Sequence, residues 1–122
     1  MLIQNGVHLR EHEYDTVKYL LNAGFNVELI PERQIKGITN PDIQIDGVVW
    51  EMKSPTGDSK NTMKHTLQNA NHQSRSVIID LRRCKLQDEK AIKDLEHHFT
   101  LSKRLRNMKI ITHDENMLDY RK

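Results

Sequence analysis

The 122-residue chain is predicted to form an α/β domain, a mixed sheet flanked by helices. Three features indicate this fold: stretches with helical apolar spacing, short apolar runs of strand length, and an Asp-Gly pair between two such runs. The expected order is α-β-β-β-α-β-α-β, in which three antiparallel strands form a meander and a crossover helix leads to a strand parallel to a neighbour. No repeat or linker divides the chain, so we expect a single domain over 1–122, with the core motif region at 11–83.

The first half of the chain is predicted to supply one helix and three strands. The helix is expected over 11–23, because apolar residues recur at helical spacing and Gly24 provides a stop. Alternating apolar residues predict a strand over 25–30, and a proline- and glycine-containing loop follows over 31–41. Asp46-Gly47 then favours a tight hairpin turn between two strand arms.

The second half is predicted to alternate helices and strands. A helix is expected over about 59–72, with Asp58 or Ser59 as its cap. The continuous apolar run at 76–81 is typical of a strand covered on both faces. The next helix is expected to carry a stripe of Ile92, Leu95 and Phe99 that extends to Leu105, and a last short strand lies at 108–112.

Composition excludes several classes of protein. Hydrophobic residues make up 36% and charged residues 30% of the chain, which is typical of a soluble globular protein. No apolar run approaches the roughly 20 residues that cross a bilayer, and the first residues lack the pattern of a secretion signal, so we expect no membrane association. The one cysteine, Cys84, excludes an internal disulfide and is expected to be a small buried side chain.

With a net charge of +2 the chain is mildly basic, and the positions of its basic residues are more informative about ligands than the net charge is. Basic residues gather in two groups, which are Arg82, Arg83 and Lys85, and Lys103, Arg104, Arg106 and Lys109. Such groups would suit contacts to phosphate. Aromatic residues make up only 5% of the chain, so binding by stacked bases has little support.

The predicted hairpin sorts its side chains into two faces. With Asp46-Gly47 as the loop, Ile45 opposes Val48, Ile43 opposes Trp50 and Asp42 opposes Glu51, and opposed residues share a face. One face is then apolar, with Ile43, Ile45, Val48, Trp50 and Met52. The other holds Asp42, Gln44, Val49, Glu51 and Lys53. The clean sorting supports this register, because a slip of one residue would mix the faces.

The polar face predicts a metal-dependent centre that cleaves phosphodiester bonds. Asp42 and Glu51 would repel each other when directly opposed, whereas a shared Mg²⁺ or Mn²⁺ would turn the repulsion into ligation. Lys53 projects from the same face, where its ammonium could stabilise charge on a phosphate. Asp46 is assigned to the turn, where Asp is favoured. If the turn slides, Asp46 would be the ligand in place of Asp42.

These residues resemble the signature of the PD-(D/E)xK nucleases, in Pro41-Asp42 and Glu51-Met52-Lys53. The predicted element order also resembles the core of that superfamily. The longer stretch from "HEYDTVKYLL" to "SVIIDLRR" is similar to the C-terminal tRNA-nuclease domains of CdiA-type contact-dependent inhibition toxins and to related phage and mobile-element domains.

The resemblance implies a set of roles. Asp42 and Glu51 would be the ligands of Mg²⁺ or Mn²⁺, Lys53 the catalytic lysine, and Glu13 the acid that the first helix contributes. The protein would be a bacterial RNase that cleaves tRNA and is neutralised by an immunity protein, and whether an elongation factor also binds is left open. It would act in the cytoplasm, and one route of delivery there would be as part of a larger secreted toxin.

Four further residues are expected to contact nucleic acid. Ser54 and Lys60 follow the active strand closely in the sequence. Arg82 and Arg83 end the 76–81 strand, and strand ends of open α/β sheets often border the ligand crevice.

Three alternatives remain open from the sequence. A DNA endonuclease of the same superfamily would cleave the same kind of bond. A metal-independent RNase of the barnase, colicin or RelE type would use a general base, with His12 and His65 placed nearest the proposed site. The third alternative is a nucleic-acid-binding module without catalysis.

Overall fold

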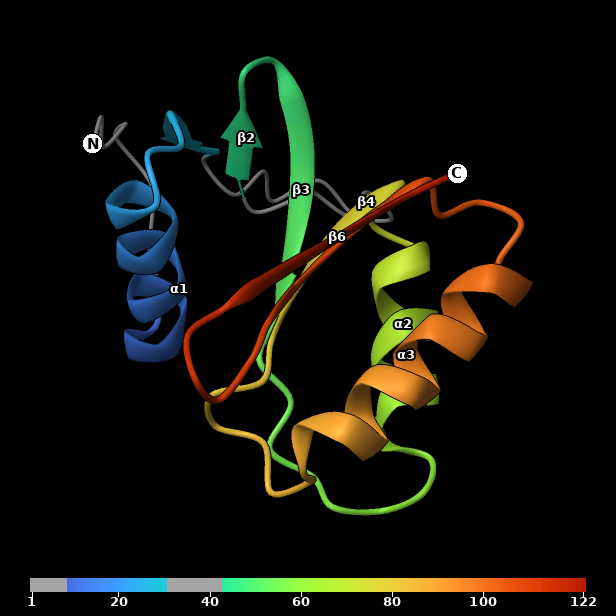
Figure 1. The fold of residues 1–122 in the computed structure, drawn as a ribbon. Helices are drawn as coiled ribbons and strands as arrows, with labels where there is room; N and C mark the ends of the chain where they lie inside the picture. The colour runs from blue at the N-terminus through green and yellow to red at the C-terminus, as the bar shows by residue number, and fades with distance from the viewer. Residues whose placement is uncertain (1–8, 31–42) are drawn as a thin grey trace.

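The computed structural model describes residues 9–30 and 43–122 (Figure 1). The elements are α1 (Glu11–Asn22), β1 (Val27–Leu29), β2 (Ile43–Ile45), β3 (Val48–Lys53), α2 (Thr62–Asn71), β4 (Ser76–Asp80), α3 (Asp88–Leu101), β5 (Asn107–Ile111) and β6 (Met117–Arg121). The predicted order is confirmed through β5, and β6 is an addition to it. The predicted loop at 31–41 and Asp42 lie outside the described residues.

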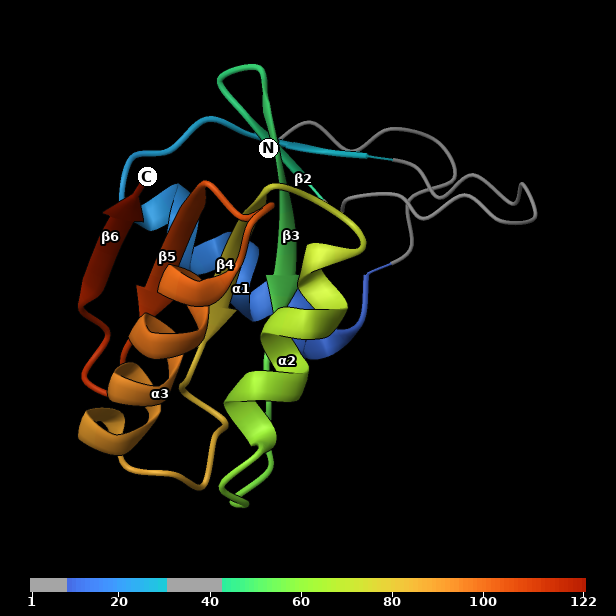
Figure 2. The ribbon, with the colours of Figure 1, turned by 90° about the vertical axis from the view of Figure 1, so that its right-hand side faces the viewer.

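The strands form one six-stranded mixed sheet in the order β1-β2-β3-β4-β5-β6. The pairs β1–β2 and β2–β3 are antiparallel, β3–β4 and β4–β5 are parallel, and β5–β6 is antiparallel. This arrangement confirms the predicted meander. The crossover helix α2 leads from β3 to the parallel strand β4, and α3 makes the same kind of connection to β5 (Figure 2).

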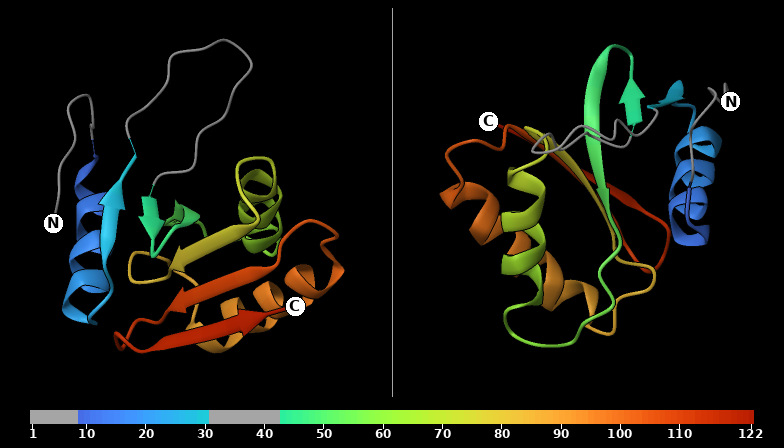
Figure 3. Two further views of the ribbon diagram at one scale, coloured as in Figure 1. Left: turned by 90° about the horizontal axis from the view of Figure 1, so that it is seen from above. Right: turned by 180° about the vertical axis from the view of Figure 1, so that it is seen from behind.

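Helices cover the two faces of the sheet unequally. The helix α1 packs on one face, whereas α2 and α3 pack side by side on the other (Figures 1 and 3). Each face has its own apolar core, one centred on Val17, Leu20 and Trp50, the other on Met63, Leu95 and Ile110. All five residues of β4 are buried, which confirms the strand predicted to be covered on both faces.

The hairpin between β2 and β3 has the predicted turn and register. Asp46 and Gly47 have φ angles of 49° and 85°, and two positive φ angles are what a type I′ hairpin turn requires. Ile43 pairs with Trp50 and Ile45 pairs with Val48, as predicted. Because side chains alternate along a strand, the predicted polar face of β3 points away from the core beneath α1.

The strand β6 was missed by the sequence prediction. It pairs antiparallel with all of β5, and its residues Leu118 and Tyr120 pack against the core beneath α2 and α3. The turn before it contains Glu115 at a φ of 63°. Leu118 and Tyr120 alternate with polar residues, a pattern that favours a half-buried strand and could have revealed it.

The predicted helix boundaries need two corrections. The stripe on α3 ends with the helix at Leu101, so Leu105 lies in the following loop, where it is nevertheless fully buried. Its backbone N–H donates to Ser102 Oγ at 3.1 Å, which holds the loop against the core. The second helix begins at Thr62 and its N-cap is Asn61, whereas Ser59 shapes the preceding turn by accepting the N–H of Asn61 at 3.2 Å.

Cys84 is buried, as predicted. Its thiol donates to the carbonyl of Gly57 at 3.4 Å, which links the segment after β4 to the segment after β3.

His113, just after β5, joins three segments of the chain. Its Nδ1 lies 2.6 Å from the Asp88 carboxylate at the start of α3, and its Nε2 lies 2.7 Å from the carbonyl of Cys84. The Cys84 carbonyl, together with Asp88, raises the pKa of the His113 imidazole above its ordinary value of 6.5. Two acceptors facing two ring nitrogens favour the doubly protonated ring.

Replacement of Gly47 by alanine should destabilise the domain. No atom lies within 4 Å of the position a Cβ would take, so the cost comes from the backbone conformation alone. We expect a loss of about 1 kcal/mol in the free energy of unfolding, measured by urea denaturation. Asp46→Asn is the matched control, because Asn tolerates a positive φ. Equal stability of the wild type and the Gly47→Ala variant would contradict the assignment of the turn.

His113 should make stability depend on pH. Because its pKa is raised in the folded state, its contribution is fully present below about pH 6.5 and is lost as the pH rises through the higher folded value. The gap in denaturation midpoint between the wild type and His113→Gln should therefore be larger at acidic than at alkaline pH. His65→Gln, at an exposed position of α2, is the control. A gap that widened with rising pH would refute this assignment.

Candidate functional site

Glu51 and Lys53 form a charge pair on one face of β3. Lys53 Nζ lies 3.6 Å from Glu51 Oε1, and the side chains are 25% and 5% exposed. Two residues apart on a strand, they project to the same side, as the sequence predicted. The third member of the predicted set, Asp42, lies outside the described residues.

The pair points toward the helices α2 and α3. Glu51 is in register with Val77 and Lys53 with Ile79, and these β4 side chains belong to the core beneath α2 and α3. Met52, between them, points into the opposite core beneath α1. The strand β3 therefore carries a polar pair on one face and apolar anchors on the other.

Asp46, the alternative ligand, occupies the turn. Its side chain is exposed and accepts a hydrogen bond from Asn26 Nδ2 at 3.4 Å. The register of the hairpin is the one from which Asp42, rather than Asp46, was predicted to oppose Glu51.

Glu13 caps its own helix. Its Oε1 accepts the backbone N–H of Arg10 at 2.9 Å, which is half of a capping box at the start of α1. Since α1 packs on the sheet face opposite to Glu51 and Lys53, the structure does not bring Glu13 to the charge pair. Its catalytic role stays a prediction.

A second group of polar residues surrounds a small cavity at the carboxyl ends of β3 and β4. The cavity has a volume of about 120 Å³, and its lining residues come from α1, from the last residue of β4 and from the segments that follow β3 and β4: His12, Asp15, Ser54, Asp80, Arg82 and Arg83. Three predicted phosphate-contacting residues thus lie together here. Arg83 Nη2 also donates to the carbonyl of Ser54 at 3.1 Å.

Asp80 is the buried anchor of this edge of the sheet. Its carboxylate accepts hydrogen bonds from Thr16 Oγ1 at 2.7 Å and from Arg82 Nη2 and Nε at 2.7 and 3.0 Å. Burial alone would raise the pKa of Asp80, but the hydrogen bonds from Arg82 and Thr16 outweigh it and lower the pKa below 3.8. Asp80 in turn raises the pKa of the Arg82 guanidinium. The pair is therefore fully ionised at neutral pH.

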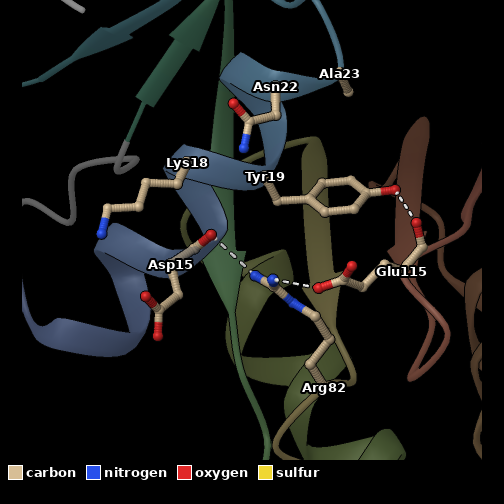
Figure 4. Close-up of a pocket in the computed structure, with 7 residues that line it drawn as sticks. All are labelled: Asp15, Lys18, Tyr19, Asn22, Ala23, Arg82 and Glu115. Atoms are coloured by element: carbon tan, nitrogen blue, oxygen red, sulfur yellow. Dashed lines mark hydrogen bonds and ion pairs between the residues drawn. The ribbon is translucent and has the colours of Figure 1, made fainter.

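Arg82 continues from Asp80 into a neighbouring pocket, drawn in Figure 4. Its guanidinium donates to the carbonyl of Asp15 at 2.9 Å and lies 3.8 Å from Glu115 Oε1. Its Cζ lies over the Tyr19 ring, 5.3 Å from the ring centroid. The Tyr19 hydroxyl donates to the carbonyl of Glu115 at 2.8 Å. Arg82 thus ties α1 and the β5–β6 turn to the end of β4.

The two adjacent arginines therefore differ in what they offer a ligand. The guanidinium of Arg82 is committed to protein partners, whereas Arg83 is the more exposed of the two. Asp80 and Thr16 were not predicted from the sequence. An acid within an otherwise apolar strand was the signal for Asp80, because a buried carboxylate requires partners.

Lys60 is exposed in the turn before α2 and does not line this cavity. Within 9–30 and 43–122, the structure shows no group of three or more His, Cys, Asp or Glu side chains arranged to hold a metal ion. Over the same residues, no helix is long and apolar enough to cross a membrane.

The fold and the site define a mixed α/β domain that gathers acidic and basic side chains on β3 and at one sheet edge. Residues 39–117 match the family model of the contact-dependent growth inhibition CdiA C-terminal domain. Because the match spans more than half of the chain, the protein belongs to this family. The comparison with curated proteins found no match.

A solved structure has a similar fold. It is described as the CdiA-CT/CdiI toxin and immunity complex from Burkholderia pseudomallei, and the similarity has a TM-score of 0.72 at 17% sequence identity, covering 98% of each chain. The predicted resemblance to CdiA-type domains is confirmed. The assignment to the PD-(D/E)xK superfamily stays a prediction.

Asp80→Asn should destabilise the domain by about 3 kcal/mol at pH 7, because it removes the buried carboxylate that pairs with the Arg82 charge. Since the pKa of Asp80 is lowered, its contribution is present above about pH 3.8 and is lost as the pH falls through the lower folded value. The stability gap between wild type and variant should therefore narrow in acid, measured by urea denaturation. Asp58→Asn, at an exposed position, is the control. A gap that persists unchanged at low pH would contradict the assigned role.

Proposed function

We propose that this domain is the toxic nuclease part of a CdiA-type contact-dependent inhibition protein, a metal-dependent endoribonuclease that cleaves tRNA. The observation that carries the proposal is the charge pair of Glu51 and Lys53, 3.6 Å apart on one face of β3. Membership of the CdiA C-terminal domain family supports it, since the function of a toxin domain is to damage a target.

Glu51 and the predicted Asp42 are the proposed ligands of Mg²⁺ or Mn²⁺. Glu51, the described member of this set, supports the assignment, because hard divalent cations prefer carboxylate oxygens and its carboxylate lies beside the basic partner that the reaction needs. When bound, the ion supplies stabilisation of negative charge on the phosphate. Glu13 is left out of the ligand set, because its carboxylate caps α1.

Lys53 is the proposed catalytic lysine. Its side chain is partly exposed while its ammonium stays within 4 Å of Glu51, so it can contact both the carboxylate and an entering phosphate oxygen. Its positive charge would stabilise the charge that develops on the phosphate in the transition state. Water attacks phosphorus, and the ribose oxygen leaves with a proton.

RNA is preferred over DNA because of the toxin family, since the proposed residues act on a bond that both polymers contain. The similar structure from Burkholderia pseudomallei is described as a toxin bound to its immunity protein. By analogy, an immunity protein is the proposed partner of this chain, and an elongation factor is a further one to test. The proposed site of action is the cytoplasm of a target cell, reached as part of a larger secreted toxin.

A second candidate function is a metal-independent RNase. The observation that favours it is the cavity where His12 lies with Arg83 and Ser54. There His12 would accept the proton of a ribose 2′-hydroxyl while the 2′-oxygen attacks phosphorus. The bond from phosphorus to the 5′-oxygen of the next nucleotide would break, this oxygen would leave with a proton, and the product would carry a 2′,3′-cyclic phosphate. This activity would persist in EDTA.

The decisive experiment incubates the purified protein with total tRNA, total RNA and plasmid DNA, each with Mg²⁺, Mn²⁺ or EDTA. We expect tRNA cleavage with either metal and none in EDTA. Glu51→Gln and Lys53→Met should each reduce the rate by at least about 100-fold, because each removes a charge that acts on the scissile phosphate.

Lys64→Met, at an exposed position of α2, is the matched control and should cleave like the wild type. Melting temperatures of all variants separate loss of chemistry from loss of fold. Cleavage that survives EDTA and disappears in His12→Ala would favour the second candidate. Cleavage of plasmid DNA alone would indicate a DNA endonuclease, and cleavage of nothing would leave a binding module.

A further inference from the structure

A groove lies at the end of the sheet opposite to the carboxyl edge. It has a volume of about 560 Å³ and is formed by the hairpin and by the segments that enter β4 and β5; its lining residues are Gly47, Val48, Val49, Gln73, Ser74, Arg75, Ser76, Arg104, Arg106 and Asn107. Figure 1 shows the hairpin tip and the α3–β5 segment at the same, upper end of the molecule. Along β3, the groove residue Val49 lies two residues before Glu51 and four before Lys53, which corresponds to roughly 7 and 13 Å.

Three arginines give this groove its charge. Arg75, Arg104 and Arg106 are exposed, and within the described part of the chain none of them lies within 4 Å of a carboxylate. Lys109, which the sequence places in the same basic group, behaves differently. It is buried, forms an ion pair with Asp119 and lies over the Trp50 ring.

The groove is held in shape by hydrogen bonds between its segments. The backbone N–H groups of Arg106 and Asn107 donate to the carbonyl of Arg75 at 2.8 and 3.2 Å, which fixes the two arginine-bearing segments side by side. Ser74 Oγ donates to the carbonyl of Val49 at 3.2 Å and so ties the hairpin to the same place. The positive charges are therefore brought together by the fold itself.

We propose that this groove binds the sugar–phosphate backbone of the RNA substrate away from the scissile bond. The inference rests on the proposed function, which makes RNA the polyanion that the domain meets. Guanidinium groups match phosphate oxygens in geometry and charge. The lining contains no aromatic ring, so the groove would hold backbone rather than stacked bases. Such contacts position a strand without reading its sequence.

The test measures binding of total tRNA to the Lys53→Met protein in EDTA, so that the RNA stays intact, over a series of salt concentrations. Replacing Arg75, Arg104 and Arg106 together by alanine should reduce the slope of log affinity against log salt by about two, since each lost phosphate contact removes roughly 0.7. The same replacement of Lys64, Lys90 and Lys93 on α2 and α3 removes equal charge and should leave the slope unchanged.

An unchanged slope in the triple arginine variant, or the same reduction in the lysine control, would overturn the inference. In the first case an acidic protein surface would be the remaining ligand for the groove. If the wild type cleaves no RNA but the arginine variant still shows the reduced slope of RNA binding, the proposed nuclease function is wrong, whereas the inference that the groove binds RNA is supported. The two failures are therefore distinguishable.

A second measurement uses substrate length. A dinucleotide has a single phosphodiester bond, so when that bond lies at the charge pair it has no further phosphate to offer the groove. With the active protein, the triple arginine variant should cleave a dinucleotide like the wild type and should lose kcat/KM for tRNA. Equal loss for both substrates would show that the arginines act through the fold or at the catalytic site, and would contradict the proposal.

Discussion

The ion pair between Asp80 and Arg82 is the contact on which the arrangement of the carboxyl edge depends. Asp80 ends the doubly buried strand β4, so its charge is stable there only with partners. Thr16 and Arg82 supply them, and Arg82 reaches onward to α1 and to the β5–β6 turn. One buried carboxylate thereby fixes a helix and a turn that lie far apart in the sequence.

Side chains alternate between the two faces of β3, so the two faces have different roles. Trp50 and Met52 anchor the strand in the core beneath α1, and this anchoring fixes the direction of Glu51 and Lys53 on the other side. A charge pair on a rigid, central strand keeps its geometry better than one on a loop. The proposed chemistry thus depends on apolar residues that never meet the substrate.

The parts predictable from the sequence are those set by local chemistry. Asp46 and Gly47 fix the turn, and the turn fixes which residues of β3 share a face, so the Glu51–Lys53 pair followed from a few neighbouring residues. Contacts between distant segments were not predictable in this way. Thr16 and Asp80 are 64 residues apart, and no periodicity in either segment indicates the bond between them. The capping role of Glu13 is local, since Arg10 is only three residues away, but it was not predicted from the sequence.

The small net charge hides an uneven distribution of charge along the sheet. At the carboxyl edge Arg82 is neutralised by Asp80 and Glu115, whereas at the other end Arg75, Arg104 and Arg106 lack such partners among the described residues. A structural arginine is held by a carboxylate, because leaving a buried charge unpaired is costly. The three exposed arginines of the groove lie close together only because the fold places them there, and their positive charges repel one another. A polyanion that extends from the groove along β3 would remove that repulsion, so we infer that the groove and the strand with the proposed catalytic pair form one surface for RNA.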